Sequence, residues 1–225
     1  MVLSDKDKEG VKKLLEPVQR DVKILFFRDD SSRCQYCDVI EELLEDIHSV
    51  NEHVIYEVLD ANSDKAKEYG IEGGPVLLFE ERPNIRYRGI PSGHEFPAFL
   101  DDIVTIAKGS VDLNANAAKK IARIQEPLHV LIFVTPTCPY CPLAVRAAHH
   151  FAYANDKILA EMVEAIEWSD LADQYRVSAV PKIVVLDPET GNELLEWEGA
   201  VPEEVFADYL LHALEHKHGA HDHHH

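Results

Sequence analysis

Two short cysteine motifs constrain this sequence more than any other feature. The chain contains four cysteines, and they occur only as two C-x-x-C pairs, at residues 34–37 and 138–141. Each pair follows an apolar run typical of a buried strand, residues 22–27 or 128–134, and precedes a segment with helical periodicity. Cysteines in this arrangement indicate dithiol chemistry at the start of two helices.

The position of each motif assigns a role to each sulfur. Unpaired backbone N–H groups and the positive end of the helix dipole favour a thiolate at the first turn of a helix. A free thiol with a pKa of about 8.5 is only a few per cent ionised at neutral pH, so this preference matters. We therefore expect Cys34 and Cys138 to attack substrate disulfides. Cys37 and Cys141, three residues later on the same helical face, are expected to resolve the mixed disulfides.

The two motifs belong to two copies of one unit. Both halves predict a helix, a strand, the C-x-x-C motif, a helix, a strand, a short helix, two strands and a final helix. Residues 66–75 align with residues 172–181 at an offset of 106, and the C-x-x-C pairs are 104 residues apart. We predict one unit over residues 1–110, a second over 111–215, and a disordered His-rich tail over 216–225.

A proline stands directly ahead of an apolar strand in each unit. These residues are Pro75 and Pro181, 41 and 43 residues after the attacking cysteines. One such proline could simply mark a sheet edge, but two at matching places favour a shared role. We expect both to be cis prolines that pack against the dithiols. The backbone of the preceding residues, Gly74 and Val180, is expected to remain free to pair with an extended substrate segment.

This order of elements resembles the thioredoxin fold. Residues 138–141 are similar to the dithiol of glutaredoxins, and two such units in one chain resemble the protein disulfide oxidoreductases of hyperthermophiles. The resemblance covers about residues 11–212 and implies an α/β protein with two tandem thioredoxin-like units, each a mixed four-stranded sheet flanked by helices. It also implies thiol–disulfide exchange on protein substrates, by reduction, oxidation and isomerisation.

The same resemblance implies the cofactor and the partners. Redox-active disulfides would carry the electrons without any added cofactor. The partners would be protein disulfides and dithiols, together with a flavoprotein similar to thioredoxin reductase as electron donor. The sequence leaves the oligomeric state open.

One feature of thioredoxins is absent from this sequence. Thioredoxins carry an aspartate beneath the dithiol, six residues before the first cysteine, but Arg28 and Ile132 occupy these positions here. Glu167 ends a strand expected over residues 163–167 and is a candidate proton acceptor for the second site. An ordinary carboxylate at a strand end is the alternative interpretation of Glu167.

The neighbours of the two dithiols differ. Asp60 or Glu57 could accept a proton at the first site, where Arg33 precedes the attacking cysteine and could favour its thiolate. Tyr36 and Tyr140 are central residues of the two motifs and are expected to shape or cover the dithiols. We predict sites that are not equivalent, with the second pair more active on added substrates.

The charge balance argues against one class of partner. The sequence has 41 acidic and 22 basic residues, a formal net charge of −19. Nucleic-acid binding depends on neutralising phosphates with Lys and Arg, so we expect no nucleic-acid partner. Charged residues make up 28% of the chain and Asn plus Gln number only 11, which favours a thermophilic source.

Apolar segments indicate the compartment. No run approaches the roughly 18 apolar residues of a membrane span, and the first residues lack the apolar core of a signal peptide. We therefore expect a cytoplasmic protein with no membrane partner. Structural disulfides are rare in that compartment, so paired cysteines there favour redox chemistry or metal binding.

Two alternatives to a general protein disulfide oxidoreductase remain. The first is a dedicated electron carrier between a flavin reductase and a peroxidase. The second is a structural protein in which four thiolates hold zinc. Zinc motifs of the C-x-x-C type are usually separated by about 15 to 20 residues, whereas this gap is 100 residues, so we expect no metal.

Overall fold

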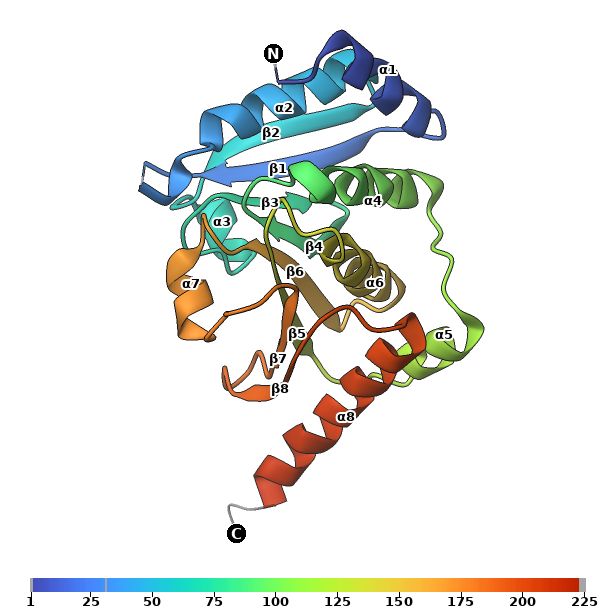
Figure 1. Cartoon of the computed structure of the whole chain (residues 1–225), viewed down its shortest axis with the longest axis vertical. Coiled ribbons are helices and arrows are strands. Elements are labelled where there is room, and N and C mark those ends of the chain that lie inside the picture. Colours follow the sequence, from blue (N-terminus) through green and yellow to red (C-terminus); the bar gives the residue numbers. More distant parts are fainter. Residues whose placement is uncertain (1, 31, 223–225) are drawn as a thin grey trace.

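A computed structural model describes residues 2–30 and 32–222 of the chain (Figure 1). The first half contains α1 (Asp5–Leu14), β1 (Val22–Arg28), η1 (Ser32–Cys34), α2 (Cys37–Val50), β2 (Val54–Asp60), α3 (Asp64–Glu68), β3 (Val76–Phe79), β4 (Arg82–Arg88), η2 (Gly93–Glu95) and α4 (Phe96–Lys108). The second half contains α5 (Ala115–Ala122), β5 (Leu128–Val134), α6 (Cys141–Ala154), β6 (Ile158–Glu164), α7 (Ser169–Gln174), β7 (Lys182–Leu186), β8 (Glu193–Glu198) and α8 (Glu203–Asp222).

The strands form one continuous sheet in the order β2-β1-β3-β4-β6-β5-β7-β8. Each half contributes four neighbouring strands, which confirms the predicted fold of two four-stranded units. The units are joined by a parallel pairing of β4 with β6, from Ile85 opposite Ala160 to Arg88 opposite Val163. The sequence did not predict this pairing.

Strand directions place both cysteine motifs at the same edge of the sheet. β3 is antiparallel to β1 and to β4, so β4 runs in the direction of β1. β6 is parallel to both β4 and β5, so β5 shares that direction. Because each motif follows β1 or β5, both lie at the carboxyl ends of these strands. Four strand spacings separate β1 from β5, a distance of roughly 19 Å.

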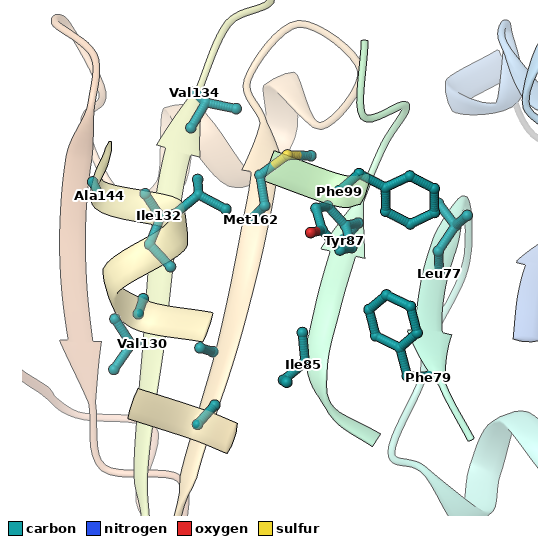
Figure 2. Packing of buried hydrophobic residues seen from close by; sticks show 14 of the residues in the cluster. Leu77, Phe79, Ile85, Tyr87, Phe99, Val130, Ile132, Val134, Ala144 and Met162 are labelled. Carbon is teal, nitrogen blue, oxygen red and sulfur yellow. The ribbon is translucent and has the colours of Figure 1, made fainter. Parts of the chain in front are cut away.

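The helices cover both faces of the sheet. Alternate side chains of a strand point to opposite faces, and one face of β1 (Ile24, Phe26) packs in the same core as α1, α2, α4, α5, α6 and α8. The other face (Leu25, Phe27) packs in a smaller core with residues of α3 and α7. Figure 2 shows that the larger core runs across the junction, where Tyr87 of β4 lies beside Met162 of β6.

Buried polar groups also join the two units. The Tyr87 hydroxyl donates to Asp102 of α4, and Nδ1 of His149 on α6 lies 2.6 Å from the same carboxylate oxygen. Glu161 of β6 is buried and pairs with Arg88 of β4 and His129 of β5. Although burial opposes its ionisation, the Arg88 guanidinium and the hydrogen bond with His129 hold the pKa of Glu161 well below its usual range.

One expectation about a strand was wrong. The strand expected over residues 163–167 is β6 (Ile158–Glu164), so Glu167 lies in the turn after it. The early part of β6 was missed because Glu161 interrupts its apolar pattern, and the structure shows that Arg88 and His129 meet this charge.

The expected disordered tail is also corrected. α8 continues to Asp222, and the Lys217 side chain is buried, with Nζ 3.6 Å from Asp187. This buried contact stabilises the last turns of the helix against the rest of the second unit. Residues 223–225 lie outside the described part of the chain. No helix among the described residues is long and apolar enough to span a membrane.

Candidate functional site

Each C-x-x-C pair forms a disulfide at the start of a helix. The Cα atoms are 5.1 Å apart for Cys34 and Cys37, and 5.5 Å apart for Cys138 and Cys141. Cys37 begins α2, Cys141 begins α6, and both are fully buried. Cys34 and Cys138, the residues expected to attack, are the more accessible cysteine of each pair. The four sulfurs form two separate pairs, so they are not gathered around a single ion as the zinc alternative requires.

A proline lies beside each dithiol. The peptide bonds Gly74-Pro75 and Val180-Pro181 are both cis, as predicted. At the second site, the Val180 carbonyl oxygen lies 3.8 Å from Sγ of Cys138. No hydrogen bond to the Val180 amide is found among the described residues, so this backbone can pair with a substrate segment.

The backbone of the first site is not free, contrary to expectation. The Gly74 N–H donates to Oδ2 of Asp29 at 2.7 Å. The Pro75 carbonyl accepts a hydrogen bond from Nε1 of Trp168 at 3.3 Å. The protein's own side chains therefore occupy the positions that an extended substrate would use at the first site.

Gly74 is also required for close packing at the first site. A Cβ atom at this position would lie 2.5 Å from the Phe27 carbonyl oxygen, which belongs to β1 and cannot easily move. We expect Gly74→Ala to lower the free energy of unfolding by about 2 kcal/mol, measured by denaturant titration. Gly10→Ala is the matched control, because a Cβ at Gly10 in α1 meets nothing within 4 Å. Equal stability of the two variants would contradict this explanation.

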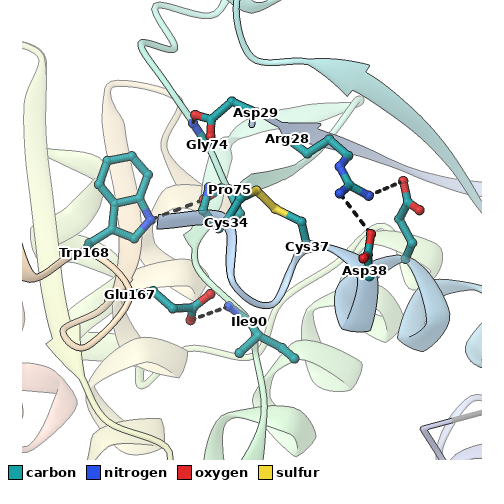
Figure 3. The surroundings of a disulfide bond; sticks show 11 residues. Arg28, Asp29, Cys34, Cys37, Asp38, Gly74, Pro75, Ile90, Glu167 and Trp168 are labelled. Atoms are coloured by element: carbon teal, nitrogen blue, oxygen red, sulfur yellow. Dashed lines mark hydrogen bonds and ion pairs between the residues drawn. A yellow bond between two sulfur atoms is a disulfide. The ribbon is translucent and has the colours of Figure 1, made fainter. Parts of the chain in front are cut away.

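The second unit covers the first dithiol (Figure 3). Trp168, in the turn between β6 and α7, is buried against Pro75. The Arg33 guanidinium stacks over the Trp168 ring at 3.9 Å and forms an ion pair with Asp170. Because Asp170 offsets its charge, Arg33 is a weaker stabiliser of a thiolate at Cys34 than the sequence suggested.

Glu167 lies at the first site, although it was expected to serve the second. Together with Gln35 and Tyr36 of the first motif, it lines a cavity of about 360 Å³. Its Oε2 accepts the Ile90 N–H at 2.9 Å, and its Oε1 is buried without a partner among the described residues. Burial raises the pKa of Glu167 to about 8, the Ile90 hydrogen bond opposes this rise, and Glu164 adds to it.

Glu95 is a candidate functional residue that the sequence did not reveal. It is buried in η2, and neither carboxyl oxygen has a partner within the described residues. η2 contacts α6, and its His94 N–H donates to the Pro136 carbonyl just before Cys138. Burial raises the pKa of Glu95 to about 8, with Asp102 adding to the rise. The sequence feature that could have indicated this residue is a single carboxylate directly before the apolar first turn of α4.

Each unit therefore places a buried carboxyl group against the other unit. Glu167 of the second unit lines the cavity beside the first cysteine pair. Glu95 of the first unit lies in η2, which contacts α6 of the second unit. A carboxyl group with a raised pKa can exchange protons near neutral pH. Neither group occupies the position six residues before an attacking cysteine, which Arg28 and Ile132 hold here.

Arg28 has a different role at the first site. Its guanidinium forms ion pairs of 2.9 Å with Asp38 and with Glu41 in the first turns of α2. Acidic side chains near a thiolate would disfavour it, and Arg28 offsets their charge (Figure 3). Ile132, the corresponding residue of β5, is buried in the core.

The other candidates lie away from the sulfurs or at the surface. Glu57 pairs with Lys23 at 3.1 Å, and Asp60 is exposed and accepts the Asn62 N–H at 2.7 Å. The hydrogen bonds and ion pairs of the described residues include none between either carboxylate and the first dithiol. Tyr36 and Tyr140 are exposed beside their dithiols and can contact a bound partner.

The comparisons with known proteins agree with this architecture. The family model described as "Thioredoxin domain" matches residues 128–212, which cover most of the second unit. Among curated proteins, the alkyl hydroperoxide reductase AhpF of Staphylococcus epidermidis is 24% identical over 187 residues, 82% of this chain and 34% of that protein. The chain thus spans about a third of the length of the curated relatives it matches.

Solved structures match both units together. A protein disulfide oxidoreductase from Aeropyrum pernix is 28% identical with a TM-score of 0.80, covering 92% of this chain and 91% of that one. The N-terminal domain of alkyl hydroperoxide reductase AhpF from Enterococcus faecalis is 24% identical with a TM-score of 0.79, covering 92% and 99%. These matches confirm the tandem thioredoxin-like fold.

Proposed function

We propose that this chain, which consists of two thioredoxin-fold units in one continuous sheet, catalyses thiol–disulfide exchange on protein substrates. One observation carries the proposal: each unit holds a pair of bonded cysteines at the start of a helix, with the attacking sulfur the more accessible of the two. The Cα separations of 5.1 and 5.5 Å lie within the usual range for a disulfide. The likeness to the Aeropyrum pernix oxidoreductase supports the same activity.

The reaction at the second site follows from the positions of its sulfurs. The Cys138 thiolate attacks one sulfur of a substrate disulfide, and the other substrate sulfur leaves as a thiolate and takes up a proton. Cys141 loses its proton and attacks Cys138, which releases the second substrate thiol. The substrate gains two electrons and two protons, and the protein becomes oxidised. Glu95, in the η2 segment that contacts α6, is the group that exchanges the proton of Cys141 in this proposal.

We rank the second dithiol as the main site for protein substrates. Its Val180 amide has no partner within the described residues, whereas Asp29 and Trp168 occupy the corresponding positions at the first site. Sulfur exposure alone gives the opposite order, since Cys138 is only 8% exposed and Cys34 is half-buried. We give the backbone more weight, because a substrate must pair with it to bring its disulfide to the sulfur.

Trp168 provides a test of this explanation. Trp168→Phe removes the N–H that donates to Pro75 but retains an aromatic ring beneath Arg33. With the second pair replaced by serine, we expect this change to increase reduction of a protein disulfide by the first pair about fivefold, because a hydrogen bond contributes about 1 kcal/mol. Insulin reduction measures the rate. An unchanged rate would show that Trp168 does not restrict access.

A second candidate function is a dedicated electron carrier. The likeness to the alkyl hydroperoxide reductases favours it, because this chain would then pass electrons from a flavoprotein to a hydroperoxide-reducing partner. Reduction of several unrelated protein disulfides separates the two functions. A general oxidoreductase reduces insulin, ribonuclease with scrambled disulfides and a peroxidase disulfide at comparable rates, whereas a dedicated carrier reduces only the peroxidase.

A further inference from the structure

Two histidines of α8 face each other across one helical turn. His212 and His216 are four residues apart, so their side chains lie on one face of the helix. Their Nε2 atoms are 3.2 Å apart. The ring planes are 72° apart, with centroids 4.7 Å from each other, so the rings are not stacked face to face. One nitrogen of each ring therefore converges on the other.

A neighbouring carboxylate fixes the tautomer of one of these rings. Nδ1 of His212 lies 3.3 Å from Oε2 of Glu215. An ionised carboxylate can only accept a hydrogen bond, so Nδ1 of a neutral His212 carries the proton and its Nε2 keeps a lone pair. Histidines that bind metals usually have this arrangement, in which the second ring nitrogen donates to a carboxylate. The Nε2 atom that faces His216 is therefore free to act as a ligand atom.

The separation of the two nitrogens fits a shared ion. Two nitrogens bound to one ion at about 2.0–2.1 Å lie roughly 3.3 Å apart at a tetrahedral angle, and roughly 2.9 Å apart at a right angle. The observed 3.2 Å lies between these values. Small rotations of the two side chains would let one ion bind both rings, in place of the hydrogen bond that joins them.

The turn that carries the pair is held in place by the rest of the second unit. Lys217, the residue after His216, is buried. Its Nζ lies 3.6 Å from Asp187 and donates to the Pro127 carbonyl at 3.4 Å. A site whose backbone is already fixed loses little conformational entropy when a ligand joins its side chains.

The pair is open to solvent and does not involve the cysteines. The His212 side chain is 56% exposed, and His216 is exposed as well. The last turns of α8 extend away from the first half of the chain (Figure 1). A hydrated ion can therefore reach both rings. Because no sulfur takes part, this pair is separate from the zinc alternative considered for the cysteines.

The type of ligand atom selects the class of ion. Imidazole nitrogen suits Zn²⁺, Cu²⁺ and Ni²⁺, whereas Mg²⁺ and Ca²⁺ prefer oxygen ligands. We infer that His212 and His216 form a two-histidine site for a divalent transition-metal ion, with Glu215 holding His212 in the ligating tautomer. Water fills the remaining coordination positions. This site goes beyond the proposed exchange function and uses none of its residues.

Isothermal titration calorimetry with Zn²⁺ tests the inference. The full chain is kept oxidised, so that all four sulfurs are in disulfides and do not bind the ion. In the parent protein for the test, the histidines at 221 and 223–225 are replaced by asparagine so that they do not compete. We expect His212→Asn or His216→Asn to weaken Zn²⁺ binding at least about tenfold, and Glu215→Gln to weaken it about threefold.

A third histidine of α8 supplies the matched control. His218 is also exposed, but it pairs with Glu126 and does not lie one helical turn from His212. His218→Asn should therefore bind Zn²⁺ as the parent does. Mg²⁺ should give no heat of binding with any of these proteins. Electron paramagnetic resonance with one equivalent of Cu²⁺ should show two bound imidazole nitrogens in the parent and one in His216→Asn.

The possible results are distinguishable. No Zn²⁺ binding by the parent, equal affinity in the parent and both ligand variants, or the same loss in His218→Asn would each overturn the site. Unchanged affinity in Glu215→Gln would overturn the part assigned to its carboxylate. Insulin reduction by His212→Asn should equal that of the parent, so failure of the metal site leaves the exchange function standing. A parent that binds Zn²⁺ through this pair but reduces no disulfide would refute the exchange function alone.

Discussion

Cys138→Ser is expected to reduce the rate of protein disulfide reduction by at least about 100-fold, because serine cannot attack a disulfide or form one. Cys34→Ser should retain more than about half of the activity, since the backbone of the first site is already occupied by Asp29 and Trp168. Insulin reduction measures both variants. Retained activity in Cys138→Ser together with its loss in Cys34→Ser would reverse the ranking.

Cys141→Ser supplies the matching control for the order of attack. If Cys138 attacks and Cys141 resolves, this variant should accumulate a mixed disulfide with its substrate, visible by mass spectrometry under non-reducing conditions. Cys138→Ser should form no such complex through Cys141, because Cys141 is fully buried. Complex formation by Cys141 alone would contradict the assigned roles.

The second large expected effect is on the pH dependence of the free energy of unfolding, and it comes from the buried carboxyl groups of Glu95 and Glu167. Burial raises the pKa of Glu95 and of Glu167 from 4.5 to about 8. Below about pH 4.5 both groups are protonated in the folded and unfolded states, so their ionisation does not change the free energy of unfolding. Between about pH 4.5 and 8 only the unfolded state loses these protons, so stability falls as the pH rises. Above about pH 8 their contribution is constant.

Replacing either group with glutamine should therefore stabilise the protein at high pH. We expect Glu95→Gln or Glu167→Gln to raise the free energy of unfolding at pH 8 by on the order of 2 to 4 kcal/mol, with almost no change at pH 4. Denaturant titrations across this range measure the effect. Glu9→Gln, at an exposed position of α1, is the matched control and should keep the slope of the parent protein. If Glu167→Gln raised the free energy of unfolding equally at every pH, ionisation of the Glu167 carboxyl group would not be the cause of the pH dependence.

The same variants separate a proton-exchange role from a purely structural one. If Glu95 exchanges the proton of Cys141, Glu95→Gln should lower the rate of the second dithiol and flatten its pH profile near pH 8. Glu167→Gln should have the matching effect only on the first dithiol. The expected pattern is crossed between the units, because each carboxyl group comes from the unit that does not carry the dithiol.

The local features of this protein could be predicted from its residues alone. Hydrophobic periodicity located β1, β5 and the helices that begin at Cys37 and Cys141, and repetition showed that one unit occurs twice. The cis prolines were predictable because they occur at matching places after both motifs. These features depend on neighbouring residues and on internal comparison, so a single chain read in order contains them.

The way in which the two units serve each other became visible only in the folded chain. The parallel pairing of β4 with β6 joins two strand edges, and such a pairing leaves no periodic signal in either strand. It brings Trp168 and Glu167 to the first dithiol and Glu95 to the helix of the second, although chain order had placed Glu167 with the second site. Contacts between edges depend on the complementarity of distant surfaces, and no local pattern specifies which surfaces will meet.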